Sequence, residues 1–242
     1  MSNLYLIRHG QAGTRHAYDA LSPLGRRQAR LLGEYFVSRE IRFAAAYAGG
    51  MSRQQETARE VAEAYAAAGA GFPGIVTERG WDEFDLNGVF TAIGPLLAAA
   101  DPEFRREYEL LLAQMEAQRD EHTAEVHRRW SPCDVKIIEA WISGRYPYAG
   151  ESWDVFRERV AACLPPDGTE ARDANIAIFT SATPTAVWAA RALDIYDGRV
   201  MRLAGVLWNS SYTVLRLRGE QLRLFTFNAA PHLLGPELRT HR

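Results

Sequence analysis

The sequence predicts an α/β fold with three layers, in which a mainly parallel sheet lies between helices and carries a helical insertion. Three observations support this fold class. Short apolar runs typical of strands alternate with amphipathic segments typical of helices. The last two strand-like runs are separated by a short turn at Gly219, as in a hairpin. A long central stretch shows no strand pattern. With 242 residues, we expect a single domain over 1–242 that holds an insertion at about 90–141.

The first element is a buried strand over 3–7, because the apolar run Leu4-Tyr5-Leu6-Ile7 is short and ends in a polar motif that contains a glycine. Ser22-Pro23 then predicts the start of a helix that extends to about Glu40, since serine is a favoured N-cap and proline a favoured first residue. The same reasoning predicts further strands over 43–47, 75–77 and 175–180, helices over 51–68 and 183–193, and a hairpin of 211–218 with 222–227.

The central stretch from Phe90 to Trp141 contains a candidate for one long charged helix, from Pro102 to Trp130. Its apolar residues recur at helical spacing, which indicates a face that packs against the main domain. We therefore expect a helical insertion that overhangs a site at the edge of the sheet. The apolar residues of this face are Phe104, Tyr108, Leu111, Leu112 and Met115.

Composition narrows the class of function. Hydrophobic residues make up 47% and charged residues 24%, as in ordinary globular proteins, and the net charge of -2 disfavours binding to nucleic acid or a membrane surface. Cys133 and Cys163 lie far apart, so we expect neither a disulfide framework nor a zinc site. The sequence shows no signal-peptide pattern and no apolar run long enough to span a membrane, so we expect a cytoplasmic protein.

Arg8-His9-Gly10 follows the first strand, and the carboxyl end of such a strand is where α/β proteins bind ligands. A neutral imidazole is a competent nucleophile near neutral pH, so His9 is the candidate nucleophile. The planar guanidinium of Arg8 suits a phosphate, and Gly10 lets the backbone approach an anion closely. Gln11, the next residue, is a candidate for the same phosphate pocket.

A second arginine, Arg53, stands in the first turn of the helix predicted over 51–68. The free N–H groups of a helix N-terminus and an arginine together favour anions. A third motif, Trp81-Asp82-Glu83-Phe84-Asp85, follows the third strand. Burial beside aromatic rings raises a carboxyl pKa and suits a general acid, so we favour Glu83, with Asp82 and Asp85 as alternatives.

Together these motifs resemble the histidine phosphatase superfamily, also called phosphoglycerate mutase-like. The resemblance rests on Arg8-His9-Gly10, on the segment 21–25, and on Arg53 with Thr57-Ala58 downstream. It implies that His9 attacks phosphorus and forms a phosphohistidine, that Arg8 and Arg53 clamp the phosphoryl oxygens, and that an acid such as Glu83 protonates the leaving group.

The sequence departs from that family after the fourth strand. The family usually has a second histidine there, followed by glycine, whereas this chain has Ala182 and Thr183. Loss of one preorganised donor typically costs about 10²–10³ in rate. We expect Thr183-Pro184 to begin a helix, and we hypothesise that its N–H groups and the hydroxyls of Ser181 and Thr183 hold a phosphate oxygen in place of the imidazole.

The leading expectation is therefore a phosphoric monoester hydrolase, weakened by the absent histidine, that acts on a small phosphorylated molecule without metal or cofactor. The alternative is a non-catalytic protein that binds a phosphorylated ligand, and a phosphoglycerate mutase ranks third. The sequence leaves the substrate and the oligomeric state open. The remaining histidines lack the spacing of a metal pair, and we expect structural or solvated roles for them: His16, His122, His127, His232 and His241.

Overall fold

The computed structural model describes residues 2–14, 18–119, 126, 130–163, 174–196, 199–219 and 221–241. Within these residues the chain forms a six-stranded sheet in the order β3-β2-β4-β1-β5-β6. Strands β3, β2, β4 and β1 are mutually parallel, and β5 and β6 are antiparallel additions. The strands are β1 (Ser2–Arg8), β2 (Ala45–Ala48), β3 (Ile75–Thr77), β4 (Asn175–Thr180), β5 (Tyr212–Arg218) and β6 (Gln221–Ala229).

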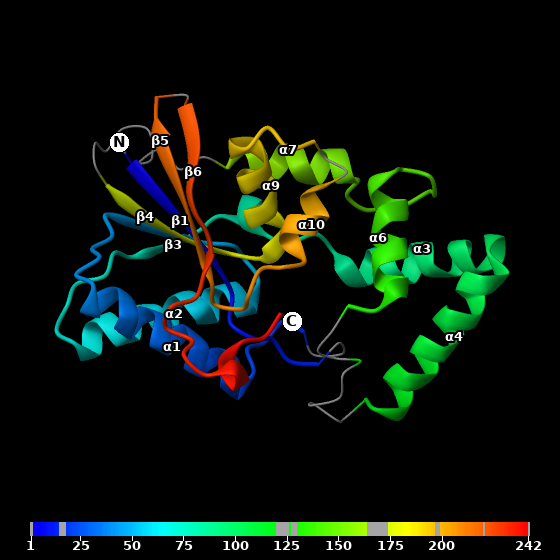
Figure 1. Ribbon diagram of the computed structural model, residues 1–242, viewed down its shortest axis with the longest axis horizontal. Helices are drawn as coiled ribbons and strands as arrows, with labels where there is room; N and C mark the ends of the chain where they lie inside the picture. Colours follow the sequence, from blue (N-terminus) through cyan, green and yellow to red (C-terminus); the bar gives the residue numbers. More distant parts are fainter. Residues whose placement is uncertain are drawn as a thin grey trace.

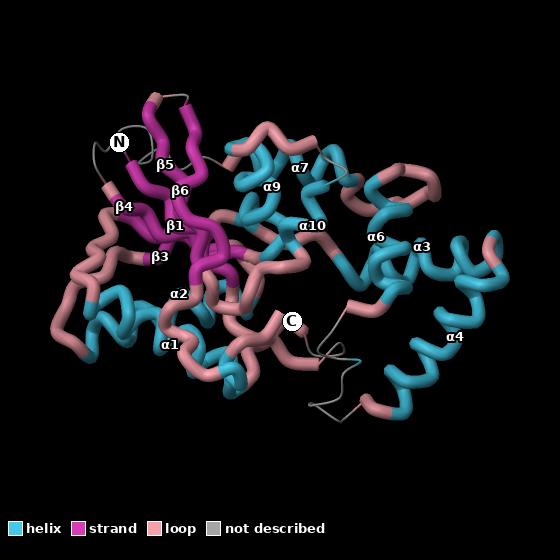
Figure 2. The backbone as a smooth tube through the Cα atoms, in the orientation of Figure 1, coloured by secondary structure: helices cyan, strands magenta, loops and turns pink. Residues whose placement is uncertain are grey.

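Helices cover both faces of this sheet, which confirms the predicted α/β class (Figure 1). Helices α1 (Pro23–Ser38) and α2 (Ser52–Ala67) lie on one face, whereas α7 (Trp153–Ala162), α9 (Ala182–Ala192) and α10 (Val200–Ala204) lie on the other (Figure 2). A third group, α3 (Leu86–Ala100), α4 (Pro102–Ala117) and α6 (Pro132–Ile142), extends beyond the second face.

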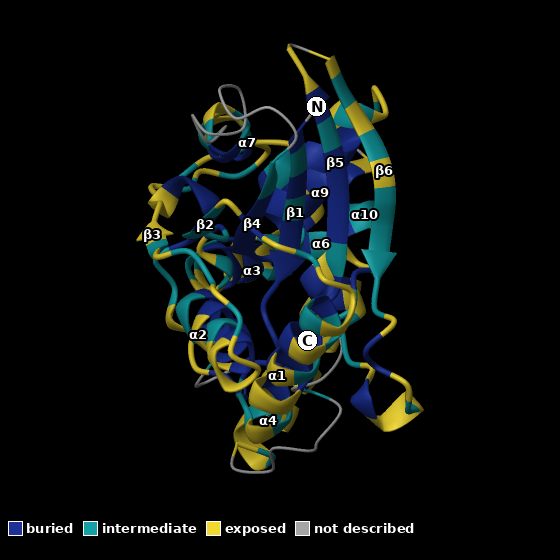
Figure 3. Cartoon of the chain, turned by 90° about the vertical axis from the view of Figure 1, so that its left-hand side faces the viewer, coloured by how far each residue is buried: buried dark blue, intermediate teal, exposed yellow. Residues whose placement is uncertain are grey.

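The period of two in the strands explains the two cores. Leu4 and Leu6 of β1 belong to the core beneath α7 and α9, whereas Ile7 packs in the core beneath α1 and α2. In β4, Ile176 faces the first core and Phe179 the second. The inner strands are accordingly mostly buried, and β3 and β6 carry exposed residues at the two edges (Figure 3).

Several helix boundaries follow from the local sequence. Ser22 accepts a hydrogen bond from the Gly25 amide at 3.0 Å and caps α1, as expected. The single helix expected over Pro102–Trp130 is shorter, because α4 ends at Ala117, with residues 120–125 and 127–129 outside the described part. The assignment of about 90–141 as an insertion stays a prediction, and helical structure begins before it, at Leu86.

Candidate active site

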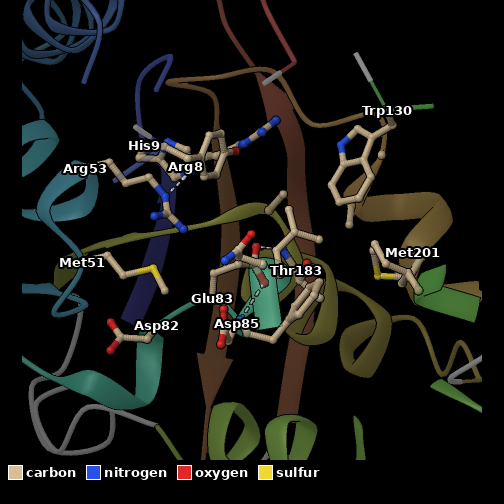
Figure 4. A pocket seen from close by; sticks show the side chains of 18 of the residues that line it. Arg8, His9, Met51, Arg53, Asp82, Glu83, Asp85, Trp130, Thr183 and Met201 are labelled. Atoms are coloured by element: carbon tan, nitrogen blue, oxygen red, sulfur yellow. Dashed lines mark hydrogen bonds between the residues drawn. The ribbon is translucent and has the colours of Figure 1, made fainter. Parts of the chain in front are cut away.

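A cavity of about 970 Å³ opens at the carboxyl ends of the parallel strands. Arg8 at the end of β1 pairs with Thr180 at the end of β4, so the residues that follow these two strands are neighbours in space. The cavity brings together five of the eight predicted site residues (Figure 4). The predicted residues in its lining are Arg8, His9, Arg53, Glu83 and Thr183 together with Ala182.

His9 is buried, with 1% of its surface exposed, and both ring nitrogens are engaged. Nδ1 lies 2.7 Å from the Gly10 carbonyl oxygen, and Nε2 lies 3.2 Å from Nε of Arg53. A carbonyl only accepts and an arginine Nε–H only donates, so Nδ1 carries the proton and Nε2 carries the lone pair. Burial, followed by the charges of Arg53 and Arg8, holds the His9 pKa well below its ordinary value. The imidazole is therefore neutral and its reactive nitrogen faces Arg53.

Arg53 stands near the N-terminus of α2 and is held from two further sides. Its Nη1 donates to Oδ1 of Asp19 at 3.2 Å, and its guanidinium lies 4.8 Å from the centre of the Tyr18 ring. Asp19 also accepts from the Ser52 amide at 3.1 Å and the Ser52 hydroxyl at 2.7 Å, so this carboxylate caps α2 from a distant loop. The sequence analysis missed Tyr18 and Asp19, because a cap supplied from more than 30 residues upstream leaves no local signal.

Arg8 also lines the cavity, but its terminal nitrogens donate hydrogen bonds to backbone carbonyls of the same chain. Nη1 donates to the Leu207 carbonyl, and Nη2 donates to the His241 carbonyl at 2.5 Å. Its Nε is buried and has no acceptor among the described residues. The expected clamp of two arginines is therefore unequal in this structure: Arg53 lies against the nucleophile, whereas Arg8 fixes the C-terminal segment and contributes its charge.

Glu83 lies in the loop before α3 and lines the cavity beside the N-terminus of α9 (Figure 4). Its Oε2 accepts from the Thr183 amide at 3.1 Å. Burial raises the Glu83 pKa, although the hydrogen bonds from Thr183 and the charge of Arg53 oppose the shift. The neighbouring Trp81 and Phe84 are buried; Trp81 packs against Trp188 and Phe84 stacks on Trp141, which fixes the loop.

The two alternative acids differ from Glu83. Asp85 caps α3 by accepting from the Gly88 amide at 2.9 Å, a structural role. Asp82 accepts from the Gly50 amide at 2.5 Å, and burial raises its pKa as well. Asp82 also lines the cavity and remains the alternative to Glu83.

The turn between β4 and α9 corrects part of the hypothesis about the absent histidine. Helix α9 begins at Ala182 with Ser181 in the N-cap position, whereas the sequence analysis expected Thr183 as the N-cap and Pro184 as the first helical residue. The Ser181 hydroxyl accepts from Nε2 of Gln54 at 2.9 Å and does not line the cavity. The Thr183 amide is bound to Glu83. The start of α9 therefore holds the acid, and Ala182 presents a methyl group to the cavity.

Gly10 and Gln11 lie outside the cavity lining. A Cβ at Gly10 would collide with the carbonyl of Gly25, so this glycine permits α1 to approach the strand end. The Gln11 side chain accepts from the Ser22 hydroxyl at 2.9 Å. Both residues thus support the position of α1, and neither contacts the space in front of His9.

Gln54, which the sequence analysis did not single out, joins three parts of the site. It is fully buried, and its Nε2 donates to the Trp81 carbonyl at 3.2 Å as well as to Ser181. Thr57 accepts from the Gly10 amide at 3.0 Å. The sequence gives no sign of these contacts, because the role of Gln54 depends on its burial, which only the structure shows.

The described residues contain no group of three or more His, Cys, Asp or Glu side chains arranged to hold a metal ion. Within the same part of the chain, no helix combines the length and apolar character that crossing a membrane requires. Of the other histidines, His16, His122 and His127 lie outside the described residues. His232 packs against Tyr35, and His241 stacks on Trp208 with ring centres 3.8 Å apart.

The fold and the site define an α/β protein with a buried histidine at the carboxyl ends of its parallel strands. The chain belongs to the histidine phosphatase superfamily (branch 1), whose family model matches residues 4–140. A mitochondrial serine/threonine-protein phosphatase, Pgam5 of Caenorhabditis elegans, is 45% identical over 56 residues, which span 23% of this chain and 20% of that relative. The chain therefore matches about a fifth of the curated relative.

Solved structures of similar fold cover nearly the whole chain. Bacillus stearothermophilus YhfR aligns with a TM-score of 0.63 and 16% identity, covering 96% of this chain and 99% of the other. A mutant phosphoserine phosphatase from Entamoeba histolytica in complex with phosphoserine gives 0.58 and 16%, covering 97% and 100%. A phosphoglycerate mutase from Bacillus anthracis gives 0.59 and 17%, covering 96% and 94%. At these identities the likeness establishes the fold alone.

Proposed function

We propose that this protein hydrolyses phosphoric monoesters through a phosphohistidine on His9. The observation that carries the proposal is the state of the His9 ring, whose Nδ1 proton is fixed on the Gly10 carbonyl and whose Nε2 lone pair faces the cavity beside Arg53. Its lowered pKa keeps this nitrogen unprotonated at neutral pH. Superfamily membership supports the same chemistry.

In the first step, Nε2 of His9 attacks phosphorus, and the ester P–O bond breaks. Arg53 offers charge to the phosphoryl oxygens, and the protonated carboxyl of Glu83 gives its proton to the departing alkoxide. In the second step, the Glu83 carboxylate takes a proton from water, the water oxygen attacks phosphorus, and the N–P bond breaks to release inorganic phosphate. Both the nucleophile and the acid return to their starting states.

The hydrolysis rate should be lower than is usual in this superfamily, because Ala182 supplies no hydrogen-bond donor at the position where the family usually has a second histidine. One lost donor typically costs about 10²–10³ in rate. The same residue favours the second candidate, a protein that binds a phosphorylated ligand without turning it over. The fold neighbours that hold phosphoserine and 3-phosphoglyceric acid support a small phosphorylated molecule as the ligand. The cytoplasmic location stays a prediction, since the curated relative is mitochondrial.

The test compares the parent with His9→Ala on a generic phosphate ester, together with acid quenching of the parent in the presence of radiolabelled ester. We expect an acid-labile phosphoryl label in the parent and no label and no turnover in His9→Ala. His232→Leu is the matched control, because it also removes a buried histidine but one that lies against Tyr35, away from the cavity lining. Equal turnover in the parent and His9→Ala would refute the mechanism, whereas ligand binding without turnover in the parent would establish the binding protein.

A further inference from the structure

The cavity is much larger than a phosphate group, and its wall opposite His9 is apolar. Its volume of about 970 Å³ is at the upper end of small-molecule sites. Figure 4 shows Trp130 and Met201 facing the cavity from the side opposite to His9 and Arg53. Ile138 and Ile142 of α6 also line the cavity, and they belong to the same hydrophobic cluster as Trp130 and Met201. A bound ester would therefore place its phosphate at His9 and its alcohol portion against these side chains.

The charged side chains of the lining are distributed differently. Arg79, Asp85, Glu139 and Arg202 are exposed, so they stand at the rim with their charges already in water. The charged groups deeper in the site are those already assigned around the phosphate, with Asp82 bound to the Gly50 amide. Among the described lining residues, the apolar wall thus offers no buried charge to pair with an ammonium or carboxylate of a small polar substrate.

Resting on the proposed function, we propose that the substrate is the phosphate monoester of a hydrophobic alcohol. The alkyl or aryl group of this alcohol packs against the wall formed by Trp130, Ile138, Ile142 and Met201. This apolar surface removes a chain from water, which stabilises the complex in proportion to the area buried. The phosphate alone is common to all monoesters, so the wall determines which ester is preferred.

The test uses n-alkylphosphonates, which present the phosphate-like group but have no ester bond to break, and measures their binding by calorimetry. From ethyl- to hexylphosphonate, affinity should rise by at least roughly tenfold, because each fully buried methylene contributes about fourfold. O-phosphoserine should bind more weakly than hexylphosphonate. Equal affinity for the ethyl and hexyl compounds, or a preference for O-phosphoserine, would overturn the proposal.

Two variants localise the effect. Met201→Gln and Ile142→Thr should each reduce the ratio of hexyl to ethyl affinity, because each removes apolar surface from the wall. Leu112→Gln is the control, because Leu112 is 40% exposed on α4 and does not line the cavity, so its ratio should stay at the parental value. A parental ratio in both cavity variants would overturn the assignment of this wall. Binding does not depend on turnover, so a parent that discriminates chain length yet shows no His9-dependent hydrolysis would refute the proposed enzyme and leave the hydrophobic phosphate monoester as a ligand.

Discussion

Nε of Arg53 donates to Nε2 of His9 over 3.2 Å, so the arginine that would hold the phosphoryl group rests on the lone pair that would attack it. The contact keeps the imidazole neutral and oriented. An incoming phosphate offers the guanidinium stronger, charge-assisted acceptors than a neutral nitrogen. Transfer of Arg53 from His9 to the phosphoryl oxygens would then expose the nucleophile only when its target has arrived.

The acid should be visible in the pH dependence. Burial raises the Glu83 pKa, so its protonated form persists to a higher pH than for an ordinary carboxyl. We expect kcat for alkyl phosphates to fall as pH rises through this pKa. In the variant Glu83→Gln, kcat should no longer show this fall and should be lower by about 10²–10⁴. An aryl phosphate with an acidic leaving group should be affected far less. Asp85→Asn is the control, and loss of this fall in Asp82→Asn instead would move the role of acid to Asp82.

Much of this arrangement could be predicted from sequence because it depends on short-range patterns. The alternation of Leu4 and Leu6 with Ile7 places β1 between two cores, and parallel strands end at one edge of the sheet, so His9 and Ala182 had to be neighbours. The start of α9 was misplaced because Pro184 was expected at the first helical position. Proline is also tolerated at the third, where its missing N–H would have no acceptor within the helix.

The contacts that could not be predicted join distant parts of the chain. Arg8 binds the carbonyls of Leu207 and His241, which are 199 and 233 residues away. Asp19 reaches Arg53 and Ser52 through a loop whose path is set by tertiary structure. A motif shows which side chains suit a phosphate, but it does not show that one arginine is already occupied by the backbone.

Asp19 should compete with the phosphate for Arg53. Its side chain is 62% exposed, so it can leave the guanidinium at little cost, and an exposed ion pair of this kind is worth at most about 1 kcal/mol. We expect Asp19→Asn to tighten the binding of inorganic phosphate by up to about fivefold, measured by calorimetry. Asp154→Asn removes the same charge from the exposed surface of α7 and should change nothing. Weaker binding in Asp19→Asn would show instead that Asp19 positions Arg53.

His232 should make the fold sensitive to acid. It is buried with no hydrogen-bond partner for either ring nitrogen among the described residues, and burial lowers its pKa to about 3. Below about pH 6.5 the His232 imidazole is protonated in the unfolded chain but stays neutral in the folded chain. The free energy of unfolding should therefore fall by about 1.4 kcal/mol per pH unit until the pH reaches the pKa of His232 in the folded state. Urea unfolding of His232→Leu at pH 5 and pH 7.5 should show a smaller fall than the parent. Equal falls would contradict this assignment.

Ala182→His should restore the missing donor. The Ala182 side chain lines the cavity at the first position of α9, beside the strand end that carries His9, so an imidazole there can reach the phosphoryl oxygens. We expect kcat to rise by up to about 10²–10³ with His9 present and not at all in the double variant with His9→Ala. Ala182→Gln, which adds comparable bulk but no ring, controls for the filling of the cavity. An unchanged rate in Ala182→His, with the fold intact by circular dichroism, would mean that the site already supplies this donor by other means.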